Sequence, residues 1–154
     1  MTAIDGLLKS IPLLSLLTPP QLAAVASVCE RCAFAPGESI ALAGTRADAA
    51  FYLMDGNVDC MTWGPDGEQI ATPIPAGAVL LEMAMIVDLE VNANCVARAA
   101  AKVLKLPRAA MHDVMQNDPE LTDKIIEALT VRLRDMADAM REASLPFEEL
   151  QRSA

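Results

Sequence analysis

Two closely spaced cysteines are the residues whose types and spacing come nearest to a chemical site. Cys29 and Cys32 are separated by two residues, the spacing of half a zinc knuckle or of a redox dithiol. The sequence holds no second pair with this spacing. We therefore interpret both as small apolar residues near the end of a helix, and a thiol redox protein acting through this pair stays open as an alternative.

Residues for other chemistry are sparse. His112 is the only histidine, so a metal site built from several imidazoles has no ligands. A serine or cysteine hydrolase would need this histidine beside a nucleophile, and no Gly-x-Ser-x-Gly turn occurs. The 21 acidic residues are scattered, as on a solvated surface. The sequence thus predicts no catalytic residue, no metal, no cofactor and no enzyme.

Length and charge limit the class of protein. A chain of 154 residues that is 53% hydrophobic can bury one core, so we expect a single domain over residues 1–154. Its formal charge of -9 repels phosphate backbones and anionic lipid. We expect neither nucleic acid nor membrane as a partner.

The N-terminal apolar stretch does not read as a targeting or membrane segment. It is interrupted by Lys9 and Pro12 and is too short to span a bilayer. We expect a cytoplasmic protein with reduced cysteines, because most of them fall within apolar segments where a thiol acts as a small hydrophobe. They are Cys29, Cys32, Cys60 and Cys95.

The pattern along the chain changes twice. Thr18 caps a helix that begins at two prolines, so we expect a helical lead over 1–33. Short apolar runs separated by turn pairs such as Asp55-Gly56 predict a β-roll over 34–106, with Trp63 beside a hairpin turn. Helices follow over 107–143, and a loosely specified tail occupies 144–154.

The last long helix, from Pro119 to about Glu142, carries an apolar stripe with spacings of three and four. The stripe residues are Ile126, Leu129, Leu133, Met136 and Met140. They could pack on the domain's own sheet or on a partner helix, and both interpretations stay open. In the second case we expect a homodimer, and an unidentified protein partner is a further alternative.

Three ordered blocks carry a family resemblance. The first is IPLLSLLTPPQL, and the third runs without a gap from Leu80 to Met111. Between them fall Pro36, Gly37, Ile40, Gly44, Tyr52, Gly56 and Val58. In this order the chain resembles the cyclic-nucleotide-binding domains of catabolite-activator-type regulators. The resemblance implies an α+β, mainly β fold: an antiparallel double-stranded β-helix, or jelly roll, flanked by an N-terminal helix and C-terminal helices.

The family's phosphate-binding cassette aligns with Leu80 to Ala93. Its pattern is Phe-Gly-Glu-x-Ala-Leu-Leu, then Arg-Ser/Thr-Ala, in which glutamate binds the ribose and arginine the phosphate. Here Leu80 and Leu81 replace Phe-Gly, and Glu82 matches the glutamate. The remaining aligned positions are Met83, Ala84, Val91, Asn92 and Ala93.

The resemblance therefore implies a degenerate cassette. Losing the arginine at Val91 removes about 1.5–3 kcal/mol and weakens binding about ten- to hundred-fold. We expect Leu80, Leu81, Met83, Met85 and Val91 to close the pocket, and Arg98 to face solvent.

A regulatory or protein-interaction module without tight cAMP or cGMP binding is the favoured function. A small-molecule or cyclic-nucleotide sensor with an atypical binding mode is the alternative. The helix-turn-helix domain of the family's transcription factors is not expected in this sequence.

Overall fold

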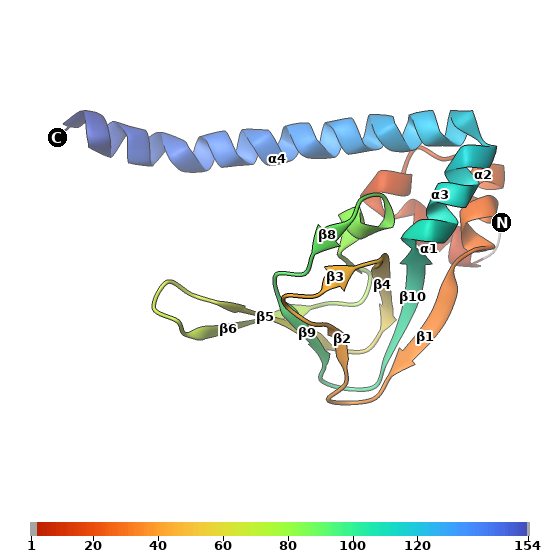
Figure 1. The fold of residues 1–154 in the computed structure, drawn as a ribbon, viewed down its shortest axis with the longest axis horizontal. Helices are drawn as coiled ribbons and strands as arrows, with labels where there is room; N and C mark the ends of the chain where they lie inside the picture. Colours follow the sequence, from red (N-terminus) through yellow and green to blue (C-terminus); the bar gives the residue numbers. More distant parts are fainter. Residues whose placement is uncertain (1–2, 154) are drawn as a thin grey trace.

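The chain folds into a β-roll with helices at one end and a long helix projecting beyond it (Figure 1). The computed structural model describes the backbone of residues 3–153 and the side chains of residues 4–142. The predicted order of lead helices, antiparallel strands and closing helices is confirmed, and so is the mainly β class.

Three short helices precede the roll: α1 (Ala3–Lys9), the 3-10 helix η1 (Pro12–Leu14) and α2 (Pro19–Ala26). The backbone N–H of Thr18 donates to Gln21 Oε1 at 2.9 Å, which is one half of a capping box at the start of α2. Lys124 Nζ donates to the same amide oxygen at 3.3 Å. The cap of α2 thus also ties the lead helices to the last helix.

Within residues 3–153, ten strands form the roll. One sheet has the order β1-β10-β4-β7, a second β2-β9-β5-β6, and β3 pairs with β8. All pairs are antiparallel. The bounds are β1 Glu30–Phe34, β2 Ser39–Ala41, β3 Arg46–Ala47, β4 Ala49–Asp55, β5 Val58–Trp63, β6 Gln69–Ile74, β7 Val79–Leu80, β8 Leu89–Glu90, β9 Asn94–Ala97 and β10 Ala101–Pro107.

Strand β10 separates two apolar cores. Ala101 and Val103 point into the roll, whereas Leu104 and Leu106 join the cluster under the helices. This division follows from the two-residue period of a strand, which sends successive side chains to opposite faces. The apolar residues of β10 are therefore buried on both faces, and Lys102 and Lys105 interrupt them at its more accessible positions.

Two helices close the chain, α3 (Arg108–Asn117) and α4 (Pro119–Ser153). Asp118 Oδ1 accepts the N–H of Leu121 at 3.1 Å and so caps the start of α4. Leu121, Ile125 and Ala128 pack into the helical core. From residue 130 to residue 142 every residue is exposed, although Arg132 still reaches Glu82, and the C-terminal part of the helix projects beyond the body (Figure 1).

Two predicted boundaries are wrong. Helix α4 does not end near Glu142 but continues to Ser153. Glu148, Glu149, Leu150 and Gln151 favour helix, whereas Pro146 in the same segment lacks the N–H of a helical hydrogen bond. The helical lead ends at Ala26, because Glu30–Phe34 pairs with β10 along its whole length. Cys32 is therefore on a strand, and Cys29 lies between α2 and β1, so the two do not share a helix.

The expectation of four reduced cysteines is also wrong. Cys60 and Cys95 face each other across β5 and β9, with a Cα–Cα distance of 4.2 Å, and form a disulfide. They are 35 residues apart in sequence, so only the strand register brings them together. None of the described helices combines the length and apolarity needed to cross a bilayer.

Gly56 offers a test of the roll. Its φ of +109° is one that side chains rarely adopt, and an added Cβ would lie 2.6 Å from the carbonyl oxygen of Ala100. We expect Gly56→Ala to lower the free energy of unfolding by about 3 kcal/mol or more, the sum of backbone strain and a clash. The measurement is urea denaturation.

Gly67→Ala is the matched control. This glycine has φ +77° but no atom within 4 Å of an added Cβ. Gly67→Ala should therefore lower the free energy of unfolding by the backbone strain alone, about 1–2 kcal/mol. Equal losses in the two variants would contradict the close approach of Gly56 to Ala100.

Candidate functional site

The candidate site is the turn between β7 and β9 together with the strands beside it. Leu81 opens the 3-10 helix η2 (Glu82–Met85) in the left-handed conformation, with φ 56° and ψ 44°. It is the only non-glycine residue with positive φ in the described part of the chain. This backbone costs a leucine about 1–2 kcal/mol, so surrounding contacts must hold it.

Glu82 supplies such contacts. Its side chain is buried, with 7% of the residue exposed, and Oε2 accepts the backbone N–H of Leu13 at 3.3 Å. Oε1 lies 3.0 Å from Nε of Arg132 on α4, without the alignment of a hydrogen bond. The carboxylate therefore faces the helices and not the interior of the roll.

Arg108 fixes the other side of the same turn. Its Nη1 donates to the carbonyls of Ala47 at 2.8 Å and Val87 at 3.1 Å, and lies 3.5 Å from that of Ala84. His112 Nε2 bonds the carbonyl of Ile86 at 2.7 Å. The first turns of α3 thus hold the carbonyl groups around η2 in place.

A cavity of about 210 Å³ opens beside this turn. Its walls come from β2, β3, the start of β4 and two cassette residues. The lining residues are Ser39, Ile40, Ala41, Leu42, Thr45, Arg46, Ala47, Asp48, Phe51, Leu81 and Val91. Ligand pockets are typically about 300–1,000 Å³, so this cavity is small for a nucleotide.

Arg46 is a cation at this cavity that sequence reasoning missed. Its guanidinium is paired with Asp88, with Nη2–Oδ2 at 2.8 Å and Nε–Oδ1 at 3.2 Å. The hydrogen bond from Arg46 lowers the pKa of the Asp88 carboxyl, and the nearby charges of Arg46 and Arg108 add to this shift. The pair leaves little net positive charge for an anion.

Comparison with known proteins decides the family. The model of the cyclic nucleotide-binding domain matches residues 31–118. The chain belongs to the cyclic nucleotide-binding domain family. The N-terminal domain of a transcriptional regulator from Streptomyces coelicolor A3(2) superposes with a TM-score of 0.80 at 22% identity, over 87% of this chain and 94% of that one. That likeness supports the fold alone.

Two curated proteins are 30% identical to this domain. Glutaminase 1 of Bradyrhizobium diazoefficiens matches over 124 residues, which are 80% of this chain and 20% of that protein. The cAMP-dependent protein kinase regulatory subunit of Aspergillus niger matches over 104 residues, 68% of this chain and 25% of that protein. The chain thus spans a quarter or less of the length of these relatives.

The structure of this cyclic nucleotide-binding domain brings together only part of the predicted pocket. Leu81 and Val91 line the cavity, and Leu80 and Ala84 are buried in the roll core. Met83 and Met85 pack into the helical core instead, because the single turn of η2 straddles both cores. The expectation that these methionines help to close the pocket is wrong. Asn92 is exposed and Ala93 half-buried.

Arg98 and Cys29 lie outside the cavity, and the sequence analysis made an expectation for each. Arg98 is exposed, as expected, and its Nη1 lies 3.2 Å from the buried carboxylate of Asp59. Burial raises the pKa of the Cys29 thiol to about 12, which disfavours the reactive thiolate. Among the described residues no group of three or more His, Cys, Asp or Glu could hold a metal ion.

The apolar stripe of α4 lies on a different face from the one that packs on the domain. Ile126, Leu133, Met136 and Met140 are exposed, and only Leu129 is partly buried against the core. Packing on the domain's own sheet, one of the two open interpretations, is therefore wrong for the four exposed residues.

Arg132 tests the contact between the cassette and α4. We expect Arg132→Met to lower the free energy of unfolding by about 1–2 kcal/mol, because the buried Glu82 carboxylate would lose its cation while Arg132 itself is half exposed. Urea denaturation measures the change. Combining Arg132→Met with Glu82→Gln should recover part of the loss in a double-mutant cycle.

Arg134→Met is the matched control, since Arg134 is exposed on the same helix. It should change stability by less than about 0.5 kcal/mol. Equal effects of the two single substitutions would argue that the pair with Glu82 contributes nothing.

Proposed function

We propose that this domain is a non-catalytic regulatory module that acts through protein contacts and does not hold cAMP or cGMP in the family's usual mode. The observation that carries the proposal is the direction of Glu82. This carboxylate accepts from Leu13, lies against Arg132 and does not line the cavity, so it points away from a ribose bound there. Binding a nucleotide in the usual mode would first require breaking both contacts.

The phosphate side of the cavity supports the same proposal. Val91, at the position of the family's arginine, is 4% exposed and belongs to the roll core. The guanidinium of Arg46 is engaged by Asp88, and Asp48 adds a carboxylate to the lining. An anion entering here would meet no unpaired cation among the lining residues, and an uncompensated charge is costly away from water.

A regulatory role agrees with the family and with one of the curated relatives, a kinase regulatory subunit. The glutaminase match involves one fifth of that protein, so its named activity is not carried over. The net charge of -9 argues against nucleic acid and anionic membranes as partners.

The cavity favours one second function, the sensing of a small uncharged molecule. Ile40, Phe51, Leu81 and Val91 give it apolar walls, and the hydroxyls of Ser39 and Thr45 could orient a ligand. Such a ligand would contact the cassette through Leu81 and Val91 without displacing Glu82.

Calorimetry with cAMP and cGMP tests the leading proposal. We expect a Kd no tighter than about 10–100 µM, since losing the arginine contact alone weakens a micromolar ligand ten- to hundred-fold. A panel of uncharged metabolites in the same assay tests the second function. Micromolar heat with cAMP that disappears in Glu82→Ala would overturn the leading proposal.

We also propose a homodimer through the stripe of α4. Leu133, Met136 and Met140 of the stripe lie within residues 130–142, where every residue is exposed and a second helix has access. The end of α4 projects beyond the body (Figure 1). Leu133→Glu puts a charge in the stripe and should convert the dimer to monomer in sedimentation velocity runs. Arg134→Glu introduces the same side chain about 100° around the helix and should leave the dimer intact. A monomeric wild type would refute the pairing.

A further inference from the structure

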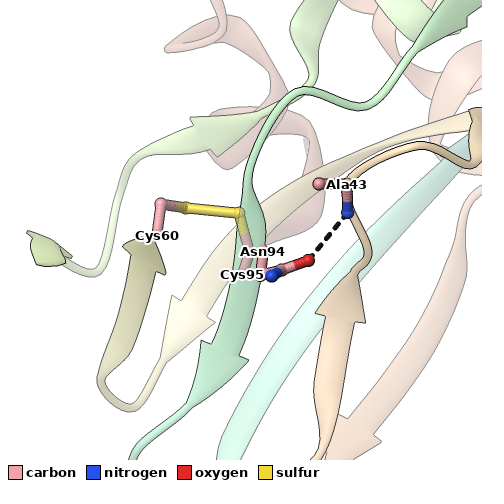
Figure 2. The surroundings of a disulfide bond; sticks show 4 residues. All are labelled: Ala43, Cys60, Asn94 and Cys95. Carbon is pink, nitrogen blue, oxygen red and sulfur yellow. Dashed lines mark hydrogen bonds between the residues drawn. A yellow bond between two sulfur atoms is a disulfide. The ribbon is translucent and has the colours of Figure 1, made fainter. Parts of the chain in front are cut away.

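The disulfide between Cys60 and Cys95 joins two strands of the sheet that borders the cavity. Cys60 in β5 lies directly opposite Cys95 in β9 (Figure 2). Cys60 is half-buried, whereas Cys95 is 4% exposed. A reagent in solution therefore reaches the sulfur of Cys60 more easily than that of Cys95.

Strand β9 also holds the loop that forms one wall of the cavity. Asn94, next to Cys95, accepts the N–H of Ala43 on its Oδ1 at 2.8 Å (Figure 2). Just before β9, Val91 accepts the N–H of Gly44 at 2.9 Å and donates its own to the carbonyl of Thr45 at 2.8 Å. Leu42 and Thr45, on either side of these contacts, line the cavity.

We propose that Cys60 and Cys95 form a reversible thiol–disulfide site whose co-substrate is a dithiol, and that the site sets the rigidity of the loop 42–45 at the cavity. With the bond closed, β9 is fixed covalently to β5. With the bond open, only ladder hydrogen bonds join β9 to β5, and the loop that depends on Asn94 and Val91 opens more often.

The exchange is balanced in atoms and electrons. A thiolate of the dithiol attacks Cys60 Sγ, forms a mixed disulfide there and releases Cys95 as a thiol after it takes up a proton. The second thiol of the reagent then attacks the reagent sulfur that is bonded to Cys60. This step closes the reagent's disulfide and releases Cys60 as a thiol. The protein gains two electrons and two protons, and the dithiol becomes a disulfide. In a reducing compartment, such as the cytoplasm we expect, this reaction runs toward the thiols.

Cys29 and Cys32, which are free thiols, do not take part. Cys29 donates its thiol hydrogen to the carbonyl of Val25 at 3.2 Å, at the far end of the helical core. Cys32 lies in β1, in the other sheet. They serve as the internal control for thiol chemistry away from the cavity.

Hydrogen exchange of the oxidised and dithiothreitol-reduced protein tests the proposal. We expect the amides of Ala43, Gly44 and Val91 to exchange about tenfold or more faster after reduction, while those of Val103 and Leu104 in β10 stay unchanged. Oxidised glutathione should restore slow exchange. Thiol titration in denaturant should count two thiols in the oxidised form and four in the reduced form.

Two variants separate this site from other cysteine effects. Cys60→Ala/Cys95→Ala should show the fast exchange permanently and ignore dithiothreitol, whereas Cys29→Ala/Cys32→Ala should respond like the wild type. Four thiols after oxidation, equal exchange in both states, or global unfolding on reduction would each overturn the proposal. The last outcome would mark the bond as purely structural.

Discussion

The carboxylate of Glu82 is the point on which the arrangement of roll and helices depends. A buried charge is stable only when its oxygens have partners, and here those partners come from η1 and α4. The left-handed backbone of Leu81 turns the chain so that Glu82 can reach them. Arg108 holds the carbonyls on the other side of the turn. One short segment thus fixes the lead helices, the roll and the last helix relative to each other.

The two cores explain why the site lies where it does. Strand β10 divides the apolar interior, and η2 sits at the border, with Ala84 in the roll core and Met85 in the helical core. A displacement of η2 would therefore disturb the packing of both cores. The helical set includes Leu121 and Ile125 of α4, so η2 contacts both the roll core and the core on which the last helix packs.

The sequence pattern and the family resemblance together predicted the fold, but they did not predict the geometry of the site. The turn at Gly56 and the cap at Asp118 have local causes, which the sequence displays. By contrast, the strand Glu30–Phe34, the Cys60–Cys95 bond and the pairing of Arg46 with Asp88 each depend on register between distant segments. Family alignment located Glu82 correctly but not its direction, because the direction is set by Arg132, fifty residues further along the chain.

Arg132 connects this site to the proposed dimer. It is one residue before Leu133, and about 100° of helix rotation separates neighbouring residues, so the ion pair and the stripe lie on adjacent faces of one turn. A helix transmits rotation along its length because its hydrogen bonds keep successive turns in register. Displacing the Glu82 carboxylate would break its ion pair with Arg132, which is one of the contacts that set the rotation of α4 and so the direction of the stripe. This geometry allows a partner on α4 and an event at the cassette to influence each other without any contact between them, and such an influence is reciprocal by linkage.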